Sequence, residues 1–312
     1  MSRALLIRLA RTLVTALICI TLTFVVLRLS GDPLDALLPE DAPQSIRDAY
    51  AARLGLDRPL YEQYLGYLGG LATGDFGRSL LDGRSAAGVV AERLPATLLL
   101  GGTAFALALL IGIPAGTIAA LRRGGPVDRG VMGVAVFGYA MPNFFLGLVL
   151  ILVFALWLRV LPSSGFGAAA HLVLPALTLG TAMAGKLARF VRGAVLDVLG
   201  QLHLRVARGK RLGRIRLVAA HLAPNAAVPV ITFLGFEAGL LVGGGVVVES
   251  VFGWPGVGRL LVQSVAARDL AVVQTIILMI ALAMILANLA ADLLHARLDP
   301  RVRAALAGEA RR

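Results

Sequence analysis

Residues 270–291 read LAVVQTIILMIALAMILANLAA, 22 residues without a charged side chain. An α-helix needs about 20 predominantly apolar residues to cross the ~30 Å hydrocarbon core of a bilayer, so this stretch predicts a transmembrane helix. The whole chain has the same character: 58% of its 312 residues are hydrophobic, only 15% are charged, and its mean hydropathy is +0.83. Soluble domains carry about 25% charged residues. The composition therefore indicates an integral membrane protein and excludes a water-soluble enzyme.

Five more uncharged runs precede this one. Leu94–Leu121 and Gly130–Leu158 are longer than a bilayer requires, Thr12–Leu27 and Leu172–Gly185 are shorter, and Leu222–Val248 is interrupted only by Glu237. Arginines flanking the first run can extend it by snorkelling, and no signal-peptide cleavage site follows it. We therefore predict an all-α integral membrane fold with six transmembrane helices, the first of them uncleaved.

The charges between the runs predict the orientation of the chain. Residues 28–93 hold 7 basic and 10 acidic side chains, whereas residues 186–221 hold nine basic side chains against Asp197 alone. Three arginines and no acid precede the first run, and basic residues outnumber acidic ones in the tail after Asp292. By the positive-inside rule this alternation predicts that both termini are cytoplasmic. The formal net charge of +12 is then a topology signal, and we expect no nucleic-acid partner.

Two segments outside the expected spans are large, and they divide the chain. Residues 1–93 comprise the first helix and an external segment, with an amphipathic helix expected at 43–54. Tyr61, Tyr64 and Tyr67 follow that helix, placed either at the membrane interface or against a partner. Residues 94–312 form the membrane core, with a basic cytoplasmic loop at about 186–221 and a cytoplasmic tail. That loop is either a helix lying under the membrane or one offered to a cytosolic partner.

The sequence shows no catalytic centre. GTAMAGKL at 180–187 nearly matches a phosphate-binding loop, but Leu187 stands where Ser or Thr would hold Mg²⁺. The four histidines are far apart and lack metal-ligand spacing, and the single cysteine, Cys19, excludes an internal disulfide. We expect a chain that is not an enzyme and binds no cofactor or metal itself.

Small and ionisable residues inside the expected spans are the candidates for packing and transport. Gly235, Gly239 and Gly243 recur every four residues, as Gly112 and Gly116 do, a pattern that lets helices approach closely within one chain or between subunits. Glu237 lies on the same expected helix. A buried acid in a membrane is costly, so Glu237 is either a residue of a translocation path or a hydrogen-bonded structural residue.

The stretch 249–259, ESVFGWPGVGR, resembles a signature of the permease subunits of type-1 ABC importers, in the branch for dipeptides, oligopeptides and nickel. Its matching residues are Glu249, Phe252, Trp254, Pro255, Gly256, Gly258 and Arg259. Further matches are Gly31-Asp32-Pro33, Leu94-Pro95-Ala96-Thr97, Met141-Pro142-Asn143-Phe144, Leu161-Pro162, Arg268-Asp269 and Leu298-Asp299-Pro300-Arg301. The turn at Trp254-Pro255-Gly256 has two interpretations, a structural chain reversal or a gating and docking element.

In the same resemblance, the cytoplasmic loop carries the short coupling helix that docks on the ATPase. The matching positions are Arg205, Val206, Ala207, Arg208, Lys210, Arg211 and Leu212, with Arg211 standing where the general consensus has Gly. The resemblance implies the type-1 importer fold, with this coupling helix between transmembrane helices four and five.

It also implies a bacterial inner-membrane location and four partners: a homologous second permease, two ATPases that use ATP and Mg²⁺, and an external solute-binding protein. The implied function is half of a translocation path, with di- or oligopeptides as the first expected solute and nickel or a glutathione-like solute as alternatives. Two other classes remain open: a gradient-driven secondary transporter, which would normally show repeats and several intramembrane ionisable residues, and a membrane scaffold without transport.

Overall fold

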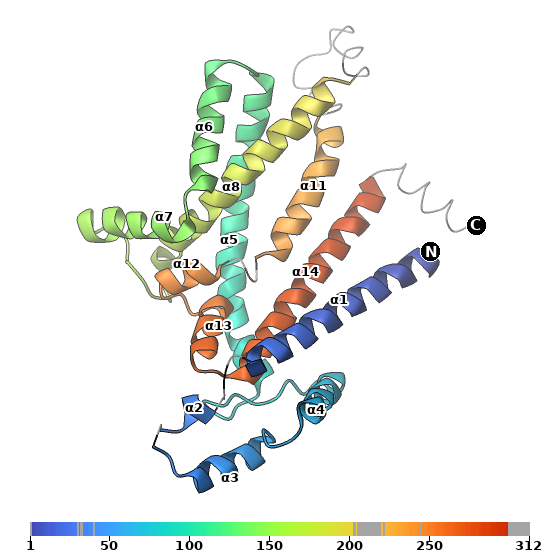
Figure 1. Ribbon diagram of the computed structural model, residues 1–312. Coiled ribbons are helices and arrows are strands. Elements are labelled where there is room, and N and C mark those ends of the chain that lie inside the picture. Colours follow the sequence, from blue (N-terminus) through green and yellow to red (C-terminus); the bar gives the residue numbers. More distant parts are fainter. Residues whose placement is uncertain are drawn as a thin grey trace.

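The computed structural model describes residues 2–29, 31, 34–39, 41–201, 204, 220, 222–241, 243 and 245–298. Within these residues the protein is helical, and one isolated bridge pairs Arg78 with Ser85. The long helices are α1 (Ser2–Leu29), α5 (Ala86–Leu121), α6 (Pro126–Ala140), α8 (Ala169–Leu199), α11 (Ala223–Gly239) and α14 (Leu270–Leu298). The shorter ones are α2 (Leu34–Leu37), α3 (Gln44–Leu54), α4 (Leu60–Thr73), α7 (Asn143–Leu150), the π-helix η1 (Ile151–Trp157), α12 (Val246–Val251) and α13 (Val257–Ala266). Helices α2, α3 and α4 gather at one end of the long helices (Figure 1).

Two helices among the described residues are long and apolar enough to cross a membrane, Ala86–Leu121 and Leu270–Ala290. The pair Pro126–Ala140 and Asn143–Trp157 also passes when its two parts are taken together, although they are bent by 99°. Val14–Leu29 is a shorter apolar helix. The expected helix at 43–54 is confirmed as α3, which begins after Pro43.

The uncharged run 130–158 is not one continuous helix, in contrast to the simplest expectation. Met141 has extended backbone angles and Pro142 precedes the first residue of α7. Proline lacks an N–H donor and disfavours helical angles in the residue before it, so the helix breaks at this point.

The run 222–248 is also interrupted. Helix α11 ends at Gly239, and α12 begins only at Val246 after a glycine-rich stretch. Conversely, α8 continues past Gly185 through Lys186, Arg189 and Arg192, where the charge pattern placed the end of a span. The helix ends therefore differ from the ends of the uncharged runs for two reasons. Proline and glycine interrupt two of the runs, and α8 continues through charged residues that have partners on other helices.

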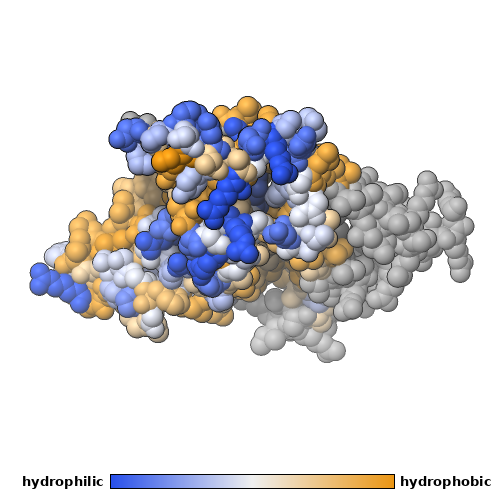
Figure 2. Space-filling view, turned by 90° about the horizontal axis from the view of Figure 1, so that it is seen from below, coloured by the Kyte–Doolittle hydropathy of each residue, from blue (hydrophilic) through white to orange (hydrophobic). Residues whose placement is uncertain are grey.

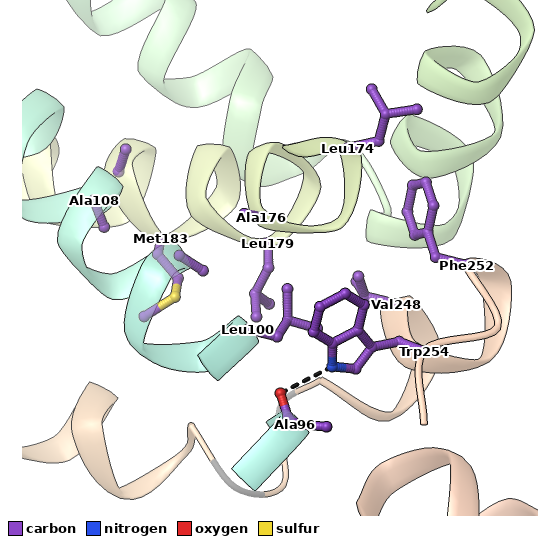
Figure 3. Close-up of a cluster of buried hydrophobic side chains, with 12 residues drawn as sticks. Ala96, Leu100, Ala108, Leu174, Ala176, Leu179, Met183, Val248, Phe252 and Trp254 are labelled. Carbon is purple, nitrogen blue, oxygen red and sulfur yellow. Dashed lines mark hydrogen bonds between the residues drawn. The ribbon is translucent and has the colours of Figure 1, made fainter. Parts of the chain in front are cut away.

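Helix α5 is the centre of the fold because it contributes to all three buried clusters. Its middle packs with α8 and α12 around Leu100, Leu174 and Trp254 (Figure 3). Its end at Ala120 joins the cluster of α8 and α11, and its beginning at Ala86 packs with Val257 of α13 and α14. The segment 249–259 is thus built into the wall of the core.

Glycines set the spacing of α5, α6 and α8. A Cβ at Gly112 would lie 2.9 Å from the carbonyl oxygen of Ala184, and one at Gly116 would overlap the carbonyl oxygen of Ala188. A Cβ at Gly185 would overlap the carbonyl oxygen of Ala135 on α6. Gly112 and Gly116 therefore serve packing within this chain.

Candidate functional site

Glu249, on α12, is the centre of a buried hydrogen-bond network. Its side chain is fully buried, and its Oε1 atom accepts a 2.7 Å hydrogen bond from the hydroxyl of Thr97 on α5. The Thr97 hydroxyl in turn accepts from the backbone N–H of Val257 at 2.7 Å, so its one proton is directed at Glu249. Oε2 accepts from the backbone N–H of Arg259 at 2.9 Å. The carboxylate thereby connects α5 to the start of α13.

Gly256 and Gly258 make room for this carboxylate. A Cβ at Gly256 would overlap the carboxylate atoms of Glu249, and a Cβ at Gly258 would lie 2.6 Å from the Cα atom of Val246. Neither position requires glycine for its backbone angles, since neither has a positive φ. Both glycines are required for space.

The aromatic residues of the segment anchor it on the other side. Trp254 is 1% exposed, and its indole N–H donates to the carbonyl oxygen of Ala96 at 2.8 Å (Figure 3). Its ring meets Phe166 edge to face, with 4.9 Å between the centroids. Phe252 is equally buried, and its carbonyl oxygen accepts from the N–H of Gly165 at 3.0 Å. The segment thus joins α5 to the loop that leads into α8.

Segments that are far apart in the sequence meet again at Arg268 and Asp269. Arg268 forms an ion pair of 2.9 Å with Asp35, and its guanidinium lies directly against Gly31. The Oδ2 atom of the buried Asp269 accepts from the Ser79 hydroxyl at 2.5 Å, immediately before α14 begins. Arg47 and Arg268 lower the pKa of the exposed Asp35 carboxyl through hydrogen bonds. These contacts hold α2 and the segment before α5 against the beginning of α14.

Two tyrosines of α4 contact α1. The hydroxyls of Tyr64 and Thr21 lie 2.6 Å apart, and the Phe24 ring packs against Tyr64 and Tyr67. Burial raises the pKa of Tyr67 to about 12. Tyr61 is 63% exposed. Tyr64 and Tyr67 therefore contact α1 within the chain.

Glu237 of α11 has a partner that the sequence did not reveal. Its side chain is 9% exposed, and its Oε1 atom lies 3.8 Å from the Nζ atom of Lys186 on α8, a side chain that is 48% exposed. Gly239, the last residue of α11, faces Met284 of α14, and Gly243, which lies beyond the end of α11, faces Ile280 of α14. Gly235 is half-buried. The structure therefore joins an acid and a half-exposed base on facing helices.

A second ion pair connects the beginning of α6 to α8. Arg192 donates two hydrogen bonds to Asp128, at 2.6 and 2.7 Å, and the N–H of Gly124 donates a third at 2.8 Å. Asp128 is 4% exposed. The carboxylate therefore pairs with one cation and one backbone donor, which compensates its burial.

We expect Asp128→Asn to lower the thermal midpoint of the purified protein at pH 7 by removing the ionic contact with Arg192. Asparagine keeps an acceptor for one donor but cannot pair with the charge of the Arg192 guanidinium, which then stays close to a neutral partner. Scanning fluorimetry in detergent measures the midpoints of the two proteins. Asp197→Asn, on an exposed acid of α8, is the control. Equal midpoints for Asp128→Asn and the wild type would contradict this assignment.

The seven coupling positions, from Arg205 to Leu212, lie outside the described residues, as does the segment after Leu298. Among the described residues, no group of three or more His, Cys, Asp or Glu side chains could hold a metal ion. In the sequence, Thr97 stands out only as part of a family motif. Lys186, Asp128 and Arg192 appear there only as charged residues near the ends of the uncharged runs. Their roles follow from contacts between distant segments, for which no local pattern existed.

The chain is similar to known proteins in sequence and in fold. The family described as binding-protein-dependent transport system inner membrane component matches residues 112–304. The glutathione transport system permease protein GsiC of Escherichia coli K12 is 42% identical over 275 residues, covering 88% of this chain and 90% of that protein, and GsiC of Shigella dysenteriae matches equally.

Solved structures show the same fold. The MetNI methionine ABC transporter in an inward-facing conformation has a chain with a TM-score of 0.58 and 20% identity, covering 68% of this chain and 96% of that one. An amino acid ABC transporter with histidines gives 0.54 and 16%, covering 67% and 94%.

The fold is therefore that of a type-1 ABC transporter permease, a multi-pass membrane protein. The chain belongs to the binding-protein-dependent transport system inner membrane component family, and it is an ABC importer permease of the dipeptide, oligopeptide and nickel-like branch. Membership implies ATPase and binding-protein partners, and the transport role agrees with the expectation that the chain is not an enzyme.

Proposed function

We propose that this permease forms half of a translocation path for a peptide-like or glutathione-like solute that an external binding protein delivers. The observation that carries the proposal is the 42% identity to a glutathione transport permease over 88% of the chain. Peptides and glutathione share amide backbones and free carboxylates, so one path can suit both. Nickel is the weaker alternative, because the described residues hold no cluster of metal ligands.

The proposed assembly contains a second, homologous permease and two cytosolic ATPases that bind ATP and Mg²⁺. Six segments of this chain cross the inner membrane: α1, α5, the bent pair of α6 with α7 and η1, α8, α11 and α14. Both termini face the cytoplasm, as the basic loop and tail indicate. The segment 205–212 contacts an ATPase. Residues 1–93, which comprise the first transmembrane helix and the external segment, pack on the core at 94–312.

Mass spectrometry of proteins that copurify with the tagged chain from native membranes tests this assembly. We expect one further permease, two copies of ATPase per complex and a binding protein. Uptake into proteoliposomes should require ATP on the side of the membrane that carries the ATPases. It should be insensitive to ionophores that collapse ion gradients. Isolation of the chain alone, together with ionophore-sensitive uptake, would instead identify a secondary transporter, and intact assembly without any transport would identify a scaffold.

Glu237 and Lys186 are the proposed polar residues of the path. A half-exposed ammonium beside a buried carboxylate can exchange its partner for the carboxylate of a passing solute, because ionisable groups within membrane helices pair with one another or with polar cargo. The Glu237→Gln and Lys186→Gln variants should each lower uptake about tenfold, equivalent to ~1.4 kcal/mol in the rate-limiting barrier.

The charge-reversed double variant, Lys186→Glu with Glu237→Lys, separates transport from packing. It restores an ion pair between α8 and α11, so protein abundance should recover while uptake stays low. Asp197→Asn serves again as the control for loss of one exposed acid. Full recovery of uptake in the double variant would show that the pair is only structural.

A further inference from the structure

A small cavity lies beside the buried network of Glu249 and opens near the beginning of α5. Its volume is about 130 Å³, and it is lined by Arg93, Pro255, Gly256, Arg259, Leu260 and Gln263. Arg93 belongs to the second turn of α5, and the other residues belong to the turn between α12 and α13 and to α13 itself. The end of the molecule that carries α2, α3 and α4 is viewed in Figure 2, where hydrophilic residues gather over the middle of the face.

The cavity is positively charged and has no acid in its lining. The exposed Arg93 side chain forms no hydrogen bond or ion pair with any residue that the structure describes, and its neighbour Glu92 pairs instead with Arg84 at 2.8 Å. Arg259 donates from one guanidinium nitrogen to the carbonyl oxygen of Gly253 at 2.6 Å, which holds its side chain in place.

The nearest buried acid does not neutralise this charge by pairing with a guanidinium. Glu249 lies behind Gly256, and its two oxygens accept from the Thr97 hydroxyl and the Arg259 backbone N–H. The two arginine side chains therefore face a cavity with unused donors, next to the amide of Gln263.

We propose that this cavity binds the free carboxylate of the transported solute at the external face of the permease. The inference rests on the proposed function and names one binding group of that solute. Guanidinium groups bind planar carboxylates through paired N–H donors. Pockets for whole ligands usually measure about 300–1,000 Å³, so a cavity of this size holds one carboxylate and leaves the remainder of the solute outside.

The position of the cavity connects binding to the core. Gly256 forms part of its lining and also contacts the Glu249 carboxylate, which bridges α5 and α13. A carboxylate held between Arg93 and Arg259 spans the same two helices from outside. Solute binding thus fixes the position of α13 against α5.

Protection from phenylglyoxal, which modifies free guanidinium groups, tests the proposal in the assembled importer complex without its binding protein. Arg93 modification is quantified by peptide mass spectrometry at constant ionic strength, with trialanine or glutathione as probes and with trialanine amide as the counterpart that lacks a free carboxylate. Arg53, an exposed arginine of α3 with no bonding partner among the described residues, is the internal control. We expect trialanine and glutathione to slow Arg93 modification about fivefold or more, as charge-assisted pairing removes the free guanidinium, while the amide and the control residue show no change.

Two outcomes would overturn the proposal. Equal modification with and without the acids would show that the cavity binds no solute carboxylate, and protection only by added binding protein would assign the cavity to an acidic side chain of that protein. The complex must first hydrolyse ATP, so a failure here is distinct from a failure of the importer assignment. As a second readout, Arg93→Gln should raise the uptake KM about fivefold with little change in kcat, since it removes one charge-assisted contact, whereas Arg53→Gln should not.

Discussion

Glu249→Ala should prevent accumulation of the folded permease. The substitution removes the acceptor of the Thr97 hydroxyl and of the Arg259 N–H and leaves a cavity in a site that is fully buried. Each buried donor left unsatisfied costs about 1–3 kcal/mol, so the total approaches the whole stability of a marginal protein. Abundance in the membrane and the elution profile in detergent measure the effect.

Glu249→Gln tests whether the network needs an acceptor at both oxygens. Glutamine keeps the shape of the side chain, but its amide group places a donor against the Thr97 hydroxyl or the Arg259 N–H. We expect an intermediate loss of thermal stability. Ser250→Ala, on the exposed side of the same helix, is the matched control, since its hydroxyl bonds only to its own helix at Val246. Wild-type abundance of Glu249→Ala would refute the structural role of the network.

Gly185→Ala should separate α8 from α6. The added Cβ overlaps the carbonyl oxygen of Ala135, a backbone atom that cannot rotate away, so one helix must move. Overpacking of this kind costs about 1–3 kcal/mol. We expect a lower thermal midpoint and reduced uptake, measured by scanning fluorimetry and in proteoliposomes.

Gly193→Ala, on the same helix, provides the control. A Cβ there meets no atom within 4 Å, and alanine favours the helix over glycine by about 1 kcal/mol. Its thermal midpoint should therefore stay level or rise. Equal destabilisation by both variants would contradict this prediction. The loss of stability in Gly185→Ala could then not be attributed to the close approach of α8 to α6.

Composition and local pattern were sufficient for the class of protein and for its family. The uncharged run 270–291 predicted a membrane helix that the structure contains as α14, and the stretch from Glu249 to Arg259 was enough to indicate an importer permease. The glycine spacing at 112 and 116 predicted close packing, although it left the partner open. These features depend on residues that are near in the sequence, where spacing alone carries the physical requirement.

Only the tertiary structure decided what the polar residues contact. Glu249 lies 152 positions from Thr97, and Asp128 lies 64 positions from Arg192, so no local period could pair them. The charge pattern ended a span at Lys186, whereas α8 continues because Lys186 has Glu237 nearby and Arg192 has Asp128. A buried charge is tolerated only when donors or a countercharge surround it. Those surroundings are assembled from several helices, so the sequence determines which helices form while their packing determines where a charge can lie.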